Sequence, residues 1–268
     1  MGLSSMPAIH NTQINPAFYR HPEEAAIIGR LVVAFGELEF TICQLAADAF
    51  GMLMPILRTL YRSRMTSSRL DTAYNLALPV CERHQLGEDW KDAYAAVLDC
   101  LRIRNRYAHS NWADHPATPG LFFTDLSAAA DAASGFEFDW RHIDVAILQN
   151  QESYFVYALE LLRFVESQIH IKLGRSPSVV LPMPLKQELP PAYNSPIQHV
   201  PPWLNEGQRA LHIARALAAQ GGPPTPTPQQ QALDKARAEK KAKREESIRK
   251  AREGDQHSKS RSTDDTEK

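Results

Sequence analysis

Residues 88–110, EDWKDAYAAVLDCLRIRNRYAHS, are the stretch that decides the fold. Apolar residues recur in it at steps of three and four, which predicts one long amphipathic helix. Its apolar stripe comprises Tyr94, Val97, Leu98, Leu101 and Ala108. Such a helix gains most of its stability by packing this stripe against other elements, so the stretch also predicts helical neighbours.

Three more helical regions are predicted, at about residues 22–50, 55–84 and 141–173. The polar run from Thr66 to Ser68 could divide the second region into two pieces. Two apolar triplets, at residues 121–123 and 136–138, fit either short strands or an ordered loop. We therefore expect an all-α fold, a four- to five-helix bundle with a short β-hairpin or ordered loop before the last helix.

The chain changes character after about residue 173, where the apolar periodicity ends. We expect the bundle to occupy residues 1–175 and a Pro-rich linker to occupy residues 176–202. A short amphipathic helix is predicted at residues 203–220. The last segment, residues 221–268, is rich in Ala, Lys, Arg and Glu, which predicts a solvated helix or a largely disordered tail. An arm that binds RNA without sequence preference is the second interpretation of that tail.

Composition excludes several classes of protein. Cys43, Cys81 and Cys100 form no CxxC pair, which predicts buried thiols in a reducing compartment and no disulfide or zinc site. The histidines show no i,i+4 pair, so neither a metal nor another cofactor is expected. No apolar run reaches 18 residues and the N-terminus resembles no signal segment, so we expect a cytoplasmic protein with no membrane contact. The net charge of −1 gives no bulk signal for nucleic acid.

The end of the helix at residues 88–110 carries an uncommon set of polar residues. On a helical wheel centred on Tyr94, Asn105 lies on the apolar stripe, and Arg104 and His109 lie on its two borders. Each residue alone has a structural explanation, because an Arg can snorkel, a His suits a helix C-terminus and an Asn can bind a neighbouring helix. Together with the nearby Arg102 and Arg106, they indicate a site for an anion beside a titratable imidazole.

The sequence here resembles a known family. Arg104-Asn105-x-x-Ala108-His109 is similar to the R-x4-6-H motif of the HEPN superfamily, and FGELE at residues 35–39 also resembles small bacterial members. The resemblance covers about residues 22–173. It implies a dimeric helical bundle that, in active members, is a metal-independent endoribonuclease.

The residue types suit that chemistry, in which the RNA 2′-OH attacks the adjacent phosphorus. His109 would be the general base or acid, and Arg104 would stabilise negative charge on the phosphoryl oxygens. Asn105 would orient His109 or the phosphate, and Arg102 and Arg106 would bind RNA. Arg104 and His109 lie about 140° apart on the wheel, so a homodimer that joins Arg of one chain to His of the other is expected.

Glu39, near the apolar face of the first helix, would position Arg104 from behind, or would simply be a surface carboxylate.

Two functions remain open. The first is a ribonuclease, as in a toxin or antiphage effector, with a protein regulator or antitoxin as a further partner. The second is a noncatalytic HEPN-like module that binds RNA or a protein through the same face. An open cleft joining Arg104 and His109 favours the first function, and a buried His109 favours the second.

Overall fold

The computed structural model describes residues 14–130, 137–176 and 180–220. Two compact units divide the chain, residues 1–214 and residues 215–268, and only the end of one helix is described in the second unit. The predicted charged tail at residues 221–268 therefore lies outside the described residues. No helix within these ranges is both long and apolar enough to cross a membrane.

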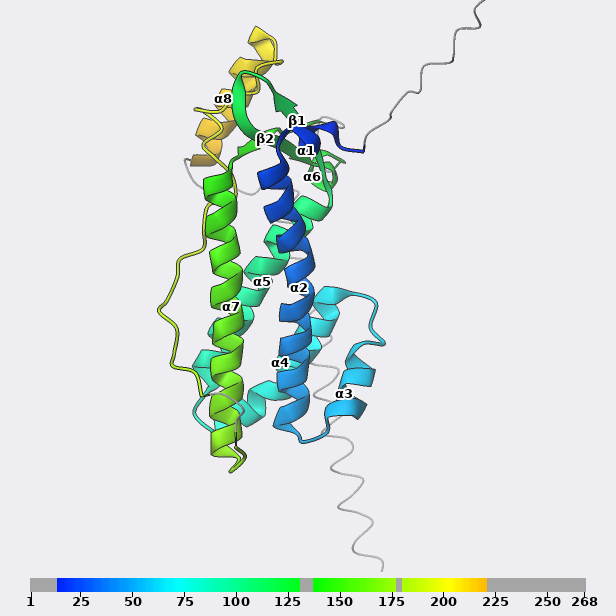
Figure 1. Ribbon diagram of the computed structural model, residues 1–268, viewed down its shortest axis with the longest axis vertical. Helices are drawn as coiled ribbons and strands as arrows, with labels where there is room; N and C mark the ends of the chain where they lie inside the picture. Colours follow the sequence, from blue (N-terminus) through cyan, green and yellow to red (C-terminus); the bar gives the residue numbers. More distant parts are fainter. Residues whose placement is uncertain (1–13, 131–136, 177–179, 221–268) are drawn as a thin grey trace, which may run out of the picture. The chain divides into compact units, whose positions relative to one another are not determined.

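The fold is mainly helical, as the sequence predicts, and it includes a small antiparallel sheet where the sequence left open a short hairpin or an ordered loop (Figure 1). The helices are α1 (Pro16–Arg20), α2 (Pro22–Ala49), α3 (Leu53–Leu60), α4 (Thr66–Arg83), α5 (Gly87–Ala108), α6 (Leu126–Ala130), α7 (Val145–Lys172) and α8 (Glu206–Gln220). The strands are β1 (Ser110–His115), β2 (Thr118–Asp125) and β3 (Arg141–Ile143).

Local sequence explains where the long helices begin and end. Pro22 occupies the first turn of α2, where its missing N–H is not needed, and the next two residues are acidic. Gly51, with φ of 65°, follows the end of α2. Asp144 caps α7 by accepting a hydrogen bond from the backbone N of Ile147 at 3.0 Å. The cap explains why α7 begins at Val145, four residues later than predicted.

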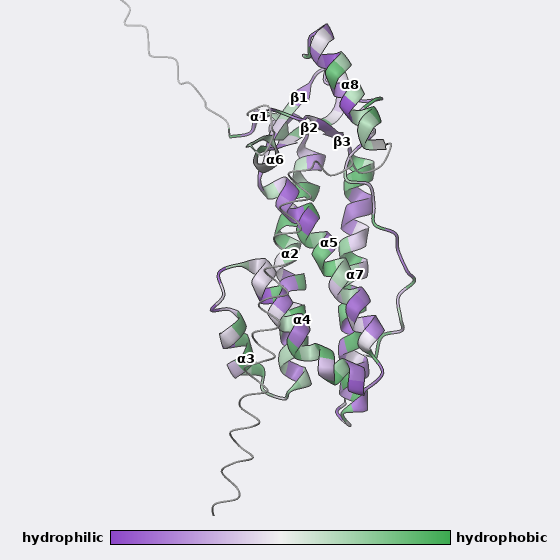
Figure 2. Ribbon diagram, turned by 180° about the vertical axis from the view of Figure 1, so that it is seen from behind, coloured by the Kyte–Doolittle hydropathy of each residue, from purple (hydrophilic) through white to green (hydrophobic). Residues whose placement is uncertain are grey.

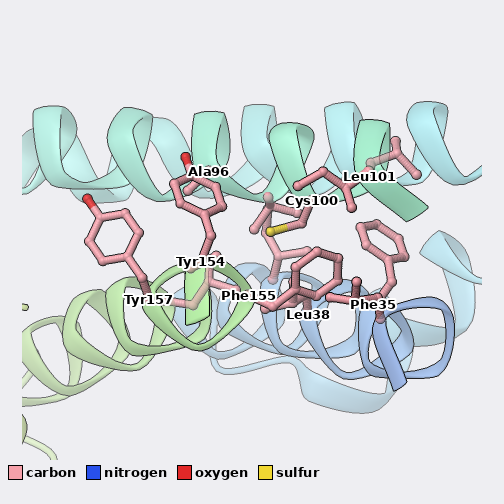
Figure 3. Packing of buried hydrophobic residues seen from close by; sticks show 14 of the residues in the cluster. Phe35, Leu38, Ala96, Cys100, Leu101, Tyr154, Phe155 and Tyr157 are labelled. Carbon is pink, nitrogen blue, oxygen red and sulfur yellow. The ribbon is translucent and has the colours of Figure 1, made fainter. Parts of the chain in front are cut away.

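The long helices α2, α4, α5 and α7 share one hydrophobic core. Figure 3 shows part of it, where Phe35 of α2, Cys100 of α5 and Phe155 of α7 lie close together. In Figure 2, hydrophobic and hydrophilic residues alternate along these helices, as packing on one side requires. Burial of a large apolar side chain of this kind contributes about 1.5–3 kcal/mol to folding.

The three cysteines lie in this core as free thiols, as predicted. Burial raises the pKa of the Cys43 thiol to about 12, and burial raises the pKa of Cys81 equally. Burial also raises the pKa of the Cys100 thiol. Neutral, buried thiols pack as small apolar groups and are poor nucleophiles.

The sheet differs in detail from the sequence prediction. Its strand order is β1-β2-β3, and Trp112 pairs with Phe123, and Leu121 pairs with Ile143. The triplet at residues 121–123 does belong to a strand. Glu137 and Phe138 do not, and Phe136 lies outside the described residues. Strand β1 was not predicted, because only Trp112 of its six residues is buried and polar neighbours hide any alternation.

The Pro-rich segment is extended, but side chains of the helical body hold its second half. Gln151 of α7, which is fully buried, donates a hydrogen bond to the carbonyl of Pro191 at 2.8 Å and accepts one from the hydroxyl of Tyr107. The backbone N of Asn194 donates to the carbonyl of His142 at 2.8 Å. The contacts attach this segment to α7 and β3.

A polar network around the buried imidazole of His142, which we call the Asn194 network, completes this attachment. It consists of Asn194, His142, Asp144 and His199. The Asn194 amide donates to Asp144 at 2.8 Å and lies 3.0 Å from Nδ1 of His142, and the imidazole of His199 stacks on that of His142 at 4.3 Å. Nε2 of His142 lies 2.7 Å from the carbonyl of Pro119. Since that nitrogen must donate, Nδ1 accepts from the amide and His142 is neutral.

Burial lowers the pKa of His142 below its usual value, and the nearby His199 lowers it further. The unfolded chain therefore takes up a proton before the folded chain does, so stability falls as the pH drops below about 6.5. We expect urea denaturation at pH 5 to require less denaturant than at pH 7. We also expect the His142 ring resonances in NMR to titrate below pH 6.5. Titration of this ring at or above pH 6.5 would contradict the assignment of a neutral, buried imidazole.

Gly120 permits the close approach of β2 to β3. Its φ is +89°, and a Cβ on it would lie 2.5 Å from the carbonyl oxygen of Ile143 and 2.9 Å from Nε2 of His142. We expect Gly120→Ala to cost at least about 1–3 kcal/mol of unfolding free energy. Gly29→Ala is the matched control, because a Cβ there meets nothing within 4 Å and its helical site gains about 0.5–1 kcal/mol. Equal unfolding free energies for the two variants, measured by chemical denaturation, would refute this role of Gly120.

Candidate functional site

The orientation of α5 determines which of the candidate residues are exposed. Its inward side carries Ala93, Val97, Cys100 and Tyr107, all buried, whereas Tyr94 is only half-buried. The wheel is therefore centred near Cys100. On that centre Arg104 lies at about +40°, Asn105 at about +140° and His109 at about 180°. The predicted position of Asn105 on the apolar stripe is wrong, because Asn105 and His109 both face outward and are exposed.

Arg104 reaches this outward face through Asn105. Its backbone lies on the inward side of the helix and its side chain is half-buried. Its guanidinium Nη1 nevertheless donates a hydrogen bond to Oδ1 of Asn105 at 2.9 Å. Asn105 and His109 are i,i+4 neighbours, with about 5–6 Å expected between their Cβ atoms. The amide of Asn105 thus holds the guanidinium toward the side of the helix that carries the imidazole.

His109 occupies the junction between α5 and β1. It is the C-cap residue of the helix, with φ of −115° and ψ of 12°, and its backbone N donates to the carbonyl of Asn105 at 3.1 Å. Ser110, which begins β1, donates its hydroxyl to the carbonyl of Arg106 and so satisfies another terminal group of the helix. The backbone of His109 is therefore fixed while its side chain is exposed.

The two flanking arginines have different surroundings. Arg102 is exposed and forms an ion pair with Asp99 one turn earlier, and Asp99 also accepts a hydrogen bond from the hydroxyl of Tyr154 at 3.1 Å. Arg106 is half-buried and lines a small cavity of about 170 Å³ beside the sheet. The other lining residues are Phe123, Asp125, Asp139, Arg141 and Tyr193.

Glu39 does not make the expected contact with Arg104. It forms a hydrogen-bonded ion pair with Arg69 of α4, which also donates to the carbonyl of Ser63 at 2.7 Å. Both charged side chains are mostly buried. The carboxylate therefore ties α2 to α4, and it is a structural residue in this arrangement. A helical wheel of one helix could not identify Arg69 as the partner of Glu39, because Arg69 lies on another helix.

Among the described residues, one group could hold a metal ion, and it lies far from His109. Ligand atoms of Asp48, Glu166 and His170 lie within 4.8 Å of one another, at the ends of α2 and α7 that point away from the sheet (Figure 1). Nε2 of His170 lies 3.9 Å from Asp48, and burial and the charge of Asp48 raise the pKa of Glu166. Arg175 already donates to the carbonyl of Asp48 at 2.7 Å, so a cation is present beside the cluster. The group is no part of the site around His109.

The sequence did not point to Arg141, Asp139 or Tyr193 as site residues. Arg141 and Asp139 form an ion pair, and the guanidinium of Arg141 lies 4.7 Å from the centre of the Tyr193 ring. Tyr193 comes from the Pro-rich segment, which the sequence places outside the bundle. The next residue, Asn194, is hydrogen-bonded to the body of the protein and thereby places Tyr193 beside Arg141.

Comparison of the chain with models of known protein families, with curated proteins and with solved structures finds no match to any of them. The HEPN resemblance therefore rests on the residues of the motif alone.

Proposed function

We propose that this protein is a HEPN-like helical bundle that acts as a metal-independent endoribonuclease in the cytoplasm. The observation that supports it is the exposed imidazole of His109 beside Asn105, whose Oδ1 holds the guanidinium of Arg104 at 2.9 Å. A proton-transfer group, a charge stabiliser and the residue that holds the charge stabiliser thus occupy one helix end. An enzyme of this kind suits a toxin or an antiphage effector held in check by a protein regulator or antitoxin.

The proposed reaction is a transesterification. His109 takes the proton of the RNA 2′-OH while the 2′ oxygen forms a bond to the adjacent phosphorus. The bond from phosphorus to the 5′ oxygen breaks, and that oxygen leaves as a 5′-OH after receiving the proton that the His109 imidazolium carries. Arg104 donates hydrogen bonds to the phosphoryl oxygens as their negative charge grows. Arg102 and Arg106 bind neighbouring parts of the RNA, and the product chain ends in a 2′,3′-cyclic phosphate.

A homodimer provides the second half of the proposed site. The backbones of Arg104 and His109 lie about 140° apart around α5, and a short Asn side chain spans only part of that angle. When two copies of the outward face of α5 cross at a two-fold axis, Arg104 of one chain approaches His109 of the partner subunit. The proposed site is therefore composite.

The second candidate function is a noncatalytic module that binds RNA or a protein partner. A groove of about 1070 Å³ between α2 and α3 supports it, because Phe40, Met54 and Tyr61 are exposed there beside Arg58 and Arg62. Exposed apolar residues with a cationic rim are typical of surfaces that bind another macromolecule.

We expect His109→Ala and Arg104→Ala each to abolish detectable RNA cleavage in the presence of EDTA. Loss of a proton-transfer group costs about 10²- to 10⁴-fold in rate, and loss of a preorganised charge stabiliser about 10²- to 10³-fold. Arg104→Lys should restore little of the cleavage activity, because an ammonium group lacks the planar fork of hydrogen-bond donors. The readout is gel-resolved cleavage of a defined single-stranded RNA, with circular dichroism to confirm that each variant folds.

His84→Ala is the matched control, since His84 is the C-cap residue of α4 and has the same place in its helix as His109 has in α5. We expect it to cut RNA at the wild-type rate. Cleavage that survives His109→Ala, or that disappears when divalent metal is removed, would overturn the proposed mechanism and favour the noncatalytic module.

The composite site makes a separate prediction for mixed subunits. A heterodimer of His109→Ala and Arg104→Ala chains contains one site with both residues intact and one with neither. Co-refolding equal amounts of the two inactive variants makes about half of the dimers heterodimers, each with one of its two sites intact, so it should restore about a quarter of the wild-type cleavage. Activity of a strictly monomeric protein, as measured by light scattering, would show that one chain forms the whole site.

A further inference from the structure

The cavity beside Arg106 is a second feature of this helix end. It lies where the last turn of α5, the end of β2, the residues before β3 and the Pro-rich segment meet, and it has a volume of about 170 Å³. Four separate stretches of one compact unit therefore supply its walls. The proposed reaction assigns only Arg106, as an RNA-binding residue, and leaves the other walls without a role.

The walls are held firmly in place. Phe123 is 2% exposed, and its ring packs edge-on against Tyr107 at 5.9 Å and at a tilt against Trp112 at 5.4 Å. Tyr193 is fixed through Asn194, whose backbone and side chain both bind the body of the protein. Arg141 lies over the Tyr193 ring, with its guanidinium carbon 4.7 Å from the ring centre. A cavity with preorganised walls of this kind can bind a planar group without a large ordering cost.

The charges around the cavity exclude a second phosphate as its ligand. Two guanidinium groups, Arg106 and Arg141, are matched by two carboxylates, Asp125 and Asp139. Carboxylates repel a phosphate, but they accept hydrogen bonds from amino and ring N–H groups. A ligand for this cavity is therefore a flat, uncharged molecule with acceptors on one edge and donors on another, which describes a nucleobase.

Guanine fits this pattern of donors and acceptors best among the four bases of RNA. Its O6 and N7 atoms form the acceptor pair that a guanidinium recognises in a two-pronged manner. Its ring N–H and its amino group offer two adjacent donors, which a carboxylate can accept together. Uracil lacks an amino group, and neither adenine nor cytosine has two acceptors and two donors on adjacent edges. The Tyr193 ring, on the face opposite Arg141, adds stacking of the kind that single-stranded RNA bases make.

We propose that this cavity binds the guanine base of the nucleotide whose phosphate is cut, so that the protein cleaves single-stranded RNA after guanosine. The inference rests on the proposed ribonuclease function. Arg106 and His109 are i,i+3 neighbours on α5, with about 5–6 Å expected between their Cβ atoms. A base that contacts Arg106 therefore has its own 3′ phosphate within reach of the imidazole.

The first experiment measures binding without catalysis. The full chain carrying His109→Ala is titrated with 3′-GMP, 3′-AMP, 3′-CMP and 3′-UMP by NMR or calorimetry. We expect 3′-GMP to bind at least about 10-fold more tightly than the other three nucleotides, as one two-pronged base contact allows. Asp139→Asn and Tyr193→Ala should each reduce this preference about 10-fold or more. Tyr193→Phe, which keeps the ring, and Glu160→Gln, an exposed carboxylate elsewhere on α7, should leave it unchanged.

The second experiment maps cleavage of a long single-stranded RNA by the wild-type chain in EDTA, and it separates the two proposals. Cuts after guanosine that lose this preference in Asp139→Asn support both. Cuts without base preference, or equal binding of the four nucleotides, overturn the guanine site and leave the ribonuclease standing. Selective binding of 3′-GMP with no cleavage of any RNA supports the cavity as a nucleotide site and overturns the ribonuclease.

Discussion

Burial of one side of α5 is the constraint on which the rest of the site depends. Ala93, Val97, Cys100 and Tyr107 must face the core that α5 shares with α2 and α7. Once they do, the helical repeat leaves Asn105 and His109 on the opposite side, exposed to solvent. Arg104 starts on the inward side and reaches outward along a half-buried stem to Asn105. The packing of the core thus determines which groups a ligand can reach.

The Asn194 network gives the Pro-rich segment a structural role near this helix end. Side chains of α7 and β3 hold that segment, and the attachment places Tyr193 against Arg141 beside Arg106. His142 is buried and neutral within the network, and Gly120 leaves room for its ring. The surroundings of Arg106 therefore depend on Tyr193, almost ninety positions further along the chain.

Sequence patterns predict the long helices well, because an apolar repeat of three and four residues reflects the burial of one helix side. They predict the division of the second helical region, although α4 begins at Thr66 and so includes the polar run, and they start the last helix four residues before its Asp144 cap. They do not predict β1, because a strand with one buried residue shows no alternation of apolar and polar residues. They also misplace the centre of the apolar side of α5, because Tyr94 resembles a core residue in sequence but is only half-buried. The pairing of Glu39 with Arg69 and the cavity around Arg106 depend on contacts between distant segments, which a single-helix pattern does not contain.

The central claim is that the exposed end of α5 catalyses transesterification of RNA without metal. The identity of the new chain ends tests it most directly. Mass spectrometry of a defined RNA, incubated with the wild-type protein in EDTA, should show a 2′,3′-cyclic phosphate on one fragment and a 5′-OH on the other. Fragments with a 5′-phosphate and a 3′-OH, which require attack by water, would contradict the account, as would an RNA that remains intact.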